Sequence, residues 1–182
     1  MALKKQWFKI KAPKTFGGGV IGSTPAVDEN QLIGRVVEMA LPDISKKYNQ
    51  FHISLKFRIT DVNEKAETEL VGHEMQKERI YRMIRRGKRK VTAMGNFKTK
   101  DGVLLRVKTV FTLIRRVNTS LKDKARAKAL EVIKKEAEKS TMEDLMKTII
   151  SYDLSKKIKS SVDKVYPCSG VEVYRSKVLE KN

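Results

Sequence analysis

The chain has 182 residues, and its charge is strongly unbalanced: 40 Lys and Arg stand against 21 Asp and Glu, for a formal net charge of +19. Hydrophobic residues make up 40% of the sequence, which is enough to bury the core of one domain, or of one and a half. A net charge this far from zero indicates a polyanionic partner, with nucleic acid as the first candidate and an anionic membrane surface as the second.

The membrane candidate finds no support along the chain. No apolar run approaches the roughly 20 residues that a spanning helix needs, and the basic N-terminus lacks the apolar segment of a signal peptide. The single cysteine, Cys168, has no partner for an intramolecular disulfide, which suits a reducing compartment. We therefore expect a soluble, cytoplasmic protein without a membrane partner, and we expect Cys168 to be an inert residue rather than a nucleophile.

The first 16 residues contain five lysines and no acidic residue, and we expect them to form a basic N-terminal arm. Its aromatic residues Trp7, Phe8 and Phe16 could insert into RNA or dock back on the core, and the sequence does not choose between these alternatives. The stretch TFGGGVIGST at 15–24 lacks the Gly-Lys-Ser/Thr that ends a phosphate-binding P-loop, so we interpret it as a flexible connector.

Strands are expected next. The segment 31–41 is rich in apolar and β-branched residues, and the segment 51–60 alternates apolar with polar residues as a half-buried strand does. A shorter strand is expected at 67–72. From 74 to 86 the apolar period becomes helical, and Gly87 follows where a helix C-cap belongs.

A β-hairpin is predicted after this helix, with strands at 89–97 and 103–116 joined by an Asp-Gly turn. Helical periodicity then runs through 119–140, which Thr119 or Ser120 would cap, and through 141–150, where Thr141 and Asp144 form a variant of the capping box. A third helix before Pro167 and a strand at 170–179 complete the chain.

This order predicts an α+β fold, with a small antiparallel β-barrel or sandwich that contains one inserted helix, followed by C-terminal helices and a final strand. The expected parts are the basic arm at 1–16, a β-rich body with the basic helix and hairpin at 17–118, and a helical layer with the closing strand at 119–182.

Catalytic patterns are missing from the sequence. His52 and His73 have no cysteine or carboxylate at ligand spacing, so we interpret both as ordinary surface residues rather than as a metal site. Glu143 and Asp144 fall in the first turn of a predicted helix, where the helix dipole favours acids. No set of nucleophile, base and orienting residue can be assembled, so we expect no enzyme, no metal and no cofactor.

The positive charge is concentrated in two blocks. Residues 4–14 contribute +5 and residues 77–116 contribute +12, so together they hold 17 of the 19 net charges. Charges placed on a predicted helix end and hairpin suit phosphate recognition on folded RNA, whereas the hairpin's only aromatics, Phe97 and Phe111, argue against base stacking as the main mode. The candidate RNA-binding residues are Arg82, Arg85, Arg86, Lys88, Arg89, Lys90, Lys98, Lys100, Arg106, Lys108, Arg115, Arg116, Lys4, Lys5, Lys9, Lys11 and Lys14.

Five ordered stretches together resemble the archaeal and eukaryotic family of small-subunit ribosomal proteins called S-three-A-e or e-S-one. The stretches are W…KAP…F (Trp7, Lys11, Ala12, Pro13, Phe16), GRVVEMAL (34–41), DGVLLRV (101–107), FTLIRRVN (111–118) and VYP…VEVYRSKVL (165–179).

The resemblance implies a structural, non-enzymatic protein on the platform of the small ribosomal subunit. Its partners would be the small-subunit rRNA and neighbouring ribosomal proteins, and the lack of long terminal extensions is typical of archaeal members. Two alternatives remain: a free-standing RNA-binding protein or RNA chaperone that acts transiently, and, more weakly, an RNA-processing enzyme whose site is assembled from distant segments.

Overall fold

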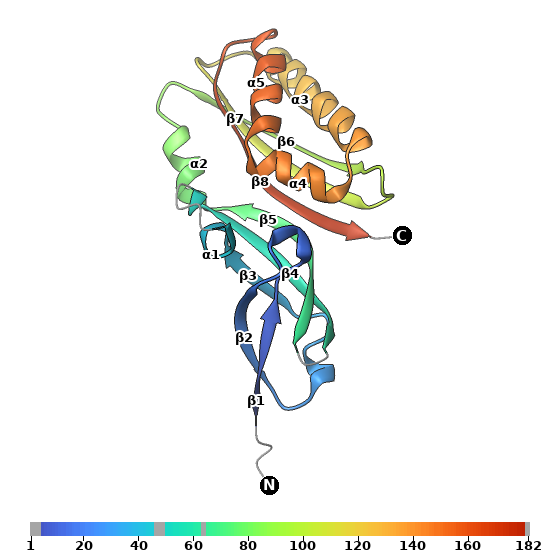
Figure 1. The fold of residues 1–182 in the computed structure, drawn as a ribbon. Coiled ribbons are helices and arrows are strands. Elements are labelled where there is room, and N and C mark those ends of the chain that lie inside the picture. The colour runs from blue at the N-terminus through green and yellow to red at the C-terminus, as the bar shows by residue number, and fades with distance from the viewer. Residues whose placement is uncertain (1–4, 46–49, 63–64, 181–182) are drawn as a thin grey trace. The chain divides into compact units, whose positions relative to one another are not determined.

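The computed structural model describes residues 5–45, 50–62 and 65–180. The chain divides into two compact units, Met1–Glu74 and Met75–Asn182. Strands β1 to β7 are interrupted by short helices, including α1 and α2, and are followed by the consecutive helices α3, α4 and α5 and the final strand β8 (Figure 1). This arrangement confirms the predicted α+β class, and the strands form open sheets of mixed direction.

The first unit is a twisted sheet in the order β2-β1-β5-β4-β3. The pairs β1–β2 and β3–β4 are antiparallel, whereas β1 and β5 run parallel where Ile10 lies beside Ala66. Its strands are β1 (Gln6–Lys11), β2 (Val20–Ala26), β3 (Val36–Ala40), β4 (Ile53–Val62) and β5 (Ala66–Met75). Its helical turns are η1 (Lys14–Phe16), η2 (Glu29–Gln31) and α1 (Leu41–Ser45).

The N-terminal segment is a strand of this sheet rather than a separate arm. Ile10 is buried and Phe8 packs partly against the same core, so the apolar residues of β1 alternate with its lysines. The interpretation of residues 15–24 as a connector was only partly correct, because β2 begins at Val20 and pairs with β1 along its length. Gly17 and Gly18 adopt positive φ angles in the turn between the two strands, which explains the glycines there.

The second unit is built on the antiparallel sheet β6-β7-β8. The helices α3, α4 and α5 lie against one face of this sheet (Figure 1). The strands are β6 (Arg89–Lys98), β7 (Leu104–Leu113) and β8 (Cys168–Glu180). The helices are α2 (Lys77–Met83), α3 (Thr119–Lys139), α4 (Met142–Ile150) and α5 (Asp153–Asp163).

Small residues let α3 approach the sheet closely. A stripe on α3 is fully buried, with Ala125, Ala129, Ile133 and Ala137 at helical spacing. Opposite this helix, Gly95 of β6 leaves no room for a side chain, because a Cβ there would lie 2.7 Å from the ring of Phe97. The predicted helical periodicity is therefore confirmed, whereas the N-cap is Asn118, which precedes both expected caps, Thr119 and Ser120.

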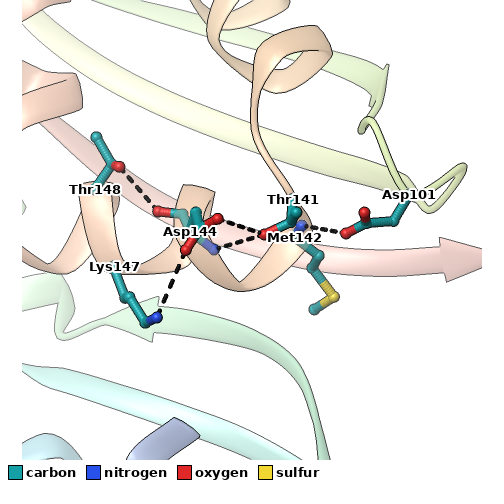
Figure 2. A network of polar contacts seen from close by, with 6 residues as sticks. All are labelled: Asp101, Thr141, Met142, Asp144, Lys147 and Thr148. Carbon is teal, nitrogen blue, oxygen red and sulfur yellow. Dashed lines mark hydrogen bonds and ion pairs between the residues drawn. The ribbon is translucent and has the colours of Figure 1, made fainter.

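The start of α4 is tied to the hairpin turn between β6 and β7 (Figure 2). Thr141 caps the helix as predicted, since its Oγ1 accepts a hydrogen bond from the Asp144 N–H at 3.3 Å. A carboxylate from the distant turn satisfies another helix donor, because Asp101 Oδ2 accepts from the Met142 N–H at 2.9 Å. The Lys100 N–H also donates to the Ser140 carbonyl, so the tip of the hairpin is fixed on the α3–α4 junction.

The helix before the hairpin is shorter than predicted. Residues 74 and 75 belong to β5, and α2 ends at Met83 because Ile84 takes an extended conformation. Gly87 has a φ of +87°, so the glycine serves the turn into β6 rather than a cap directly after the helix.

Candidate nucleic-acid interface

The two faces of the β6-β7-β8 sheet differ in their side chains. Val91, Ala93 and Phe97 of β6 point toward the helices and are buried, as the predicted alternation requires. Residues of the opposite parity form what we call the open face, where the strand register places Lys108 between Met94 and Arg175, and Arg106 between Asn96 and Lys177. Basic side chains from all three strands therefore share one surface or lie at its rim.

Six candidate residues gather at one end of this sheet and form what we call the sheet-end cluster: Arg85, Arg86, Lys88, Arg89, Arg115 and Arg116. The register pairs Arg89 with Leu113, so the loop that enters β6 and the loop that leaves β7 lie at the same edge. All of these side chains except the partly buried Lys88 are exposed. Repulsion between like charges at this edge would be relieved by a polyanion.

The backbone of this cluster is held in place by the fold. The Lys88 N–H donates to the Arg85 carbonyl across the turn at Gly87, and the Lys88 ammonium donates to the hydroxyl of Ser169 on β8. The Ile114 N–H donates to the Pro167 carbonyl and fixes the other loop in the same way. Cations held by such turns lose less conformational entropy on binding than cations on a free tail would.

The remaining candidates of the second unit lie elsewhere on its surface. Lys90 is at the start of β6 on the open face, and Arg82 is exposed on α2. Lys98 and Lys100 are exposed near the tip of the hairpin, roughly 30 Å from the sheet-end cluster at about 3.3 Å per strand residue. The structure thus brings most of the candidates together at one end and on one face, but it does not bring these two lysines there.

The N-terminal lysines belong to the first unit. Lys5 and Lys9 are exposed, and Lys11 is partly buried on β1, while Lys4 and the side chain of Lys14 lie outside the described residues. The aromatic residues separate into two groups. Phe8 packs on the core and Phe16 stacks edge-to-face on Phe57 at 6.0 Å, whereas Trp7 leaves 70% of its surface exposed.

Several basic residues on α3 and α5 form ion pairs with nearby acids. Glu131 bonds to Lys135 and Lys128, both at 2.9 Å, and these hydrogen bonds lower the pKa of Glu131 to about 2. Lys157 and Glu136 form a further pair at 2.8 Å between α5 and α3. By contrast, the part of the chain that the structure describes shows no ion pair at any arginine of the sheet-end cluster.

One acid on β8 is already engaged. Glu172 is buried and pairs with Arg79 of α2 at 3.1 Å, and burial raises the pKa of Glu172 while the guanidinium lowers it. Because Arg79 is paired with Glu172, we do not include it among the candidate RNA-binding residues.

Sequence reasoning missed five residues of the open face and its rim: Lys77, Tyr81, Tyr174, Arg175 and Lys177. Lys77 and Tyr81 come from α2, whose side chains lie over one end of the face beside Lys90 and Thr92. The alternation along β8 was a usable signal, because Arg175 and Lys177 are two residues apart and point to the same face.

The interpretation of the two histidines as surface residues was wrong, since His52 is 7% and His73 0% exposed. His73 lies inside β5, where the strand is packed into its sheet, and His52 packs edge-to-face against Phe51 at 5.6 Å. The described residues contain no group of His, Cys, Asp or Glu side chains placed to hold a metal ion. In the same residues, no helix is both long and apolar enough to cross a membrane.

Cys168 is buried and its thiol lies 3.3 Å from each of the carbonyl oxygens of Thr112 and Gly170. Burial raises the pKa of the Cys168 thiol, with a smaller contribution from Asp163. Fewer thiolates form at neutral pH as a result, which supports a packing role for this residue.

The fold and the candidate interface define a class of protein: a basic α+β protein with a cluster of exposed arginines that suits phosphate groups. A model of the Ribosomal S3Ae family matches residues 2–182, and the chain belongs to this family. Proteins named small ribosomal subunit protein eS1 are similar to it along nearly its whole length. Examples are those of Desulfurococcus amylolyticus (40% identity; 96% of this chain and 83% of the relative) and Sulfurisphaera tokodaii (36%; 97% and 92%).

Family membership confirms the resemblance inferred from the sequence, including its archaeal character, since a further relative is the eS1 protein of Methanothermobacter thermautotrophicus at 34% identity. The family consists of structural ribosomal proteins, which confirms the expectation that the chain is not an enzyme.

Proposed function

We propose that this protein is a structural constituent of the small ribosomal subunit in the cytoplasm, and that it binds rRNA through the sheet-end cluster and the adjoining open face. The names of its relatives support the first part. The observation that supports the second is a contrast within one unit: several lysines of α3 and α5 form ion pairs with acids, whereas no arginine of the sheet-end cluster does so within the part of the chain that the structure describes.

Counterion release is the physical basis of this binding. Each cation that neutralises a phosphate releases condensed counterions, so affinity falls as salt concentration rises, with a slope set by the number of contacts. Six basic residues on two fixed loops present a shaped positive surface to a folded RNA. We infer that this surface recognises the position of phosphates rather than a base sequence.

Secondary contacts are assigned to the other candidates. Lys98 and Lys100 at the hairpin tip, and Lys5, Lys9 and Lys11 on the first unit, would contact rRNA at separate places. The ion pairs on α3 and α5 mix acidic with basic groups, so we expect these helices to attract RNA less than the sheet-end cluster does and to suit neighbouring ribosomal proteins of the platform.

The test is a salt titration of binding to small-subunit rRNA. The variant carries Arg85→Glu, Arg86→Glu and Arg89→Glu, all exposed positions, and keeps Lys88 because of its bond to Ser169. A matched control carries the same charge change on α3, with Lys124→Glu, Lys134→Glu and Lys139→Glu. We expect the cluster variant to bind more weakly and its log–log salt slope to fall by roughly 2 to 3, at about 0.7–0.9 per phosphate contact.

The control variant should retain most of the slope of the unaltered protein. Equal slopes for the two variants would contradict the assignment, because charge alone and not its position would then govern binding. Tight binding of the unaltered protein to many unrelated RNAs, without preference for small-subunit rRNA, would favour the free-standing RNA chaperone instead.

A further inference from the structure

The open face carries two adjoining hollows that the phosphate contacts of the sheet-end cluster do not use. One, of about 400 Å³, is lined by Met94, Arg106, Lys108, Tyr174, Arg175 and Lys177. The other, of about 170 Å³, lies where α2 meets the sheet and is lined by Lys77, Ile80, Tyr81, Lys90, Thr92, Lys108, Val110 and Tyr174. Lys108 and Tyr174 line both, so the hollows lie side by side, and we call the two together the groove.

Two aromatic side chains, Tyr81 and Tyr174, line this groove together with basic side chains. The Lys108 ammonium lies 5.4 Å from the centre of the Tyr174 ring, close enough for a cation–π contact. Tyr81 leaves 64% of its surface exposed, and Met94 leaves 58%. Tyr174 is partly buried, so the groove offers one exposed and one partly exposed tyrosine ring beside basic side chains.

We propose that this groove binds unpaired nucleotides of RNA, with bases stacked on Tyr81 and Tyr174 and phosphates held by Lys90, Arg106 and Lys177. This inference deepens the proposed function and rests on it, since it names a second kind of RNA contact on the same unit. Stacking on aromatic rings suits any base, because every base has a π-face. Cations along the groove then follow the backbone of the strand.

Single-stranded RNA fits the groove better than an acidic or apolar peptide would. Neither hollow has a carboxylate in its lining, and each has at least three basic residues. Basic side chains alone would bind any polyanion, but the rings of the two tyrosines also offer faces on which an unpaired base can stack. Bases inside a duplex are already stacked on their neighbours, so duplex RNA would gain nothing from these rings.

The sheet supplies the rigidity that stacking requires. Tyr174 occupies a register shift in β8, since Lys108 pairs with Arg175 while Thr109 pairs with Val173. Such a β-bulge re-aims a side chain and is fixed by the hydrogen bonds on either side of it. Tyr81 is held by α2, which is anchored through the pair of Arg79 and Glu172.

The experiment measures binding of the full chain to two probes at fixed salt: an adenosine hexamer that contains one 2-aminopurine, and an RNA duplex of small-subunit rRNA sequence. The test variants are Tyr174→Leu and Tyr81→Leu, which keep apolar volume but lose the ring. Tyr174→Phe keeps the ring, and Phe51→Leu removes a 60% exposed ring from the other unit as a matched control.

We expect each leucine variant to bind the hexamer on the order of tenfold more weakly, and the quenching of 2-aminopurine fluorescence to diminish. Tyr174→Phe and Phe51→Leu should bind the hexamer as the unaltered protein does, and all variants should bind the duplex equally. Because misfolding would also reduce duplex binding, the duplex reports on the integrity of each variant.

Hexamer binding that is unaffected by both leucine variants would overturn the inference, even if the sheet-end cluster still binds rRNA. If the substitutions in the sheet-end cluster did not change rRNA binding but the leucine variants weakened hexamer binding, only the proposal for the cluster would be contradicted. The two proposals can therefore be refuted separately. Leucine variants that bind both RNAs normally but no longer enter the small subunit would assign the groove to a protein segment, which also overturns the inference.

Discussion

Loss of the Asp101 carboxylate should destabilise the second unit, because this side chain joins the hairpin turn to the start of α4. Its Oδ2 accepts from the Met142 N–H at 2.9 Å, while Thr141 Oγ1 separately accepts from the Asp144 N–H at 3.3 Å (Figure 2). Asp101→Ala removes the first bond and leaves a donor in the first turn of the helix without its partner. The second bond remains, so α4 keeps its N-cap.

The magnitude follows from the burial of the two groups. Removing a capping acceptor costs roughly 0.5–2 kcal/mol, and a fully buried orphan donor costs about 1–3 kcal/mol. Met142 is 8% exposed but Asp101 is at the surface, so water can partly replace the carboxylate. We therefore expect a loss of about 1–2 kcal/mol, which corresponds to a fall in melting temperature of roughly 3–6 °C for a chain of this size.

Thermal unfolding followed by circular dichroism measures this effect. Asp101→Asn keeps an oxygen acceptor but loses the negative charge that the helix N-terminus favours, so it should lose about half as much. Asp123→Ala is the matched control, because it removes an exposed carboxylate paired only with Arg126, at 2.7 Å within α3. A melting temperature for Asp101→Ala within 1 °C of the unaltered protein would refute the structural role of this contact.

Two further predictions concern packing and the N-terminal strand. Gly95→Ala should lower the free energy of unfolding of the second unit by about 1–3 kcal/mol in chemical denaturation, since its Cβ would lie 2.7 Å from the Phe97 ring and 3.4 Å from Leu130. Gly22→Ala is the control, because a Cβ there meets open space. Equal losses for the two variants would contradict the packing argument. Trp7 is the only tryptophan of the chain and is 70% exposed. If the lysines of β1 contact rRNA, the fluorescence of Trp7 should change when rRNA binds and should recover at high salt. Unchanged emission at saturating RNA would exclude Trp7 from the interface.

Much of the fold could be predicted from periodicity. The alternation at 51–60 correctly identified β4, with Ile53, Leu55 and Phe57 all buried, and the Asp-Gly turn correctly identified the hairpin, where Gly102 has a φ of +79°. The predictions for these segments are correct because the local sequence pattern and the tertiary environment favour the same structure. The N-terminus was predicted to be an arm because of its five lysines. Phe8 and Ile10 nevertheless show the two-residue alternation of a strand.

Helix boundaries and partners across the fold were harder to predict. The pattern at 74–86 suggested a helix throughout, but pairing of β5 extends to Met75 and leaves α2 only seven residues. No local signal could reveal that Asp101 caps a helix 41 residues away. Long-range contacts of this kind depend on how the chain folds back, which sequence spacing does not encode.

The candidate site was predicted in part for similar reasons. Charge density alone made Arg85 to Lys90 candidates, because five of these six residues are Lys or Arg. The groove was missed because its residues come from α2, β6, β7 and β8, and Tyr174 reaches the open face through a register shift. The two hairpin aromatics, Phe97 and Phe111, are both buried, and the expectation that base stacking is not the main binding mode stays a prediction.

The most direct test of the ribosomal role is sedimentation of a tagged copy from cell lysate through sucrose gradients at low and high salt, beside the Arg85→Glu, Arg86→Glu, Arg89→Glu variant. We expect the unaltered protein to migrate in stoichiometric amounts with small subunits and to remain there at high salt, whereas the variant should be depleted from them. Release of the unaltered protein into the top fractions at moderate salt would contradict a built-in ribosomal constituent and would favour a transient RNA binder.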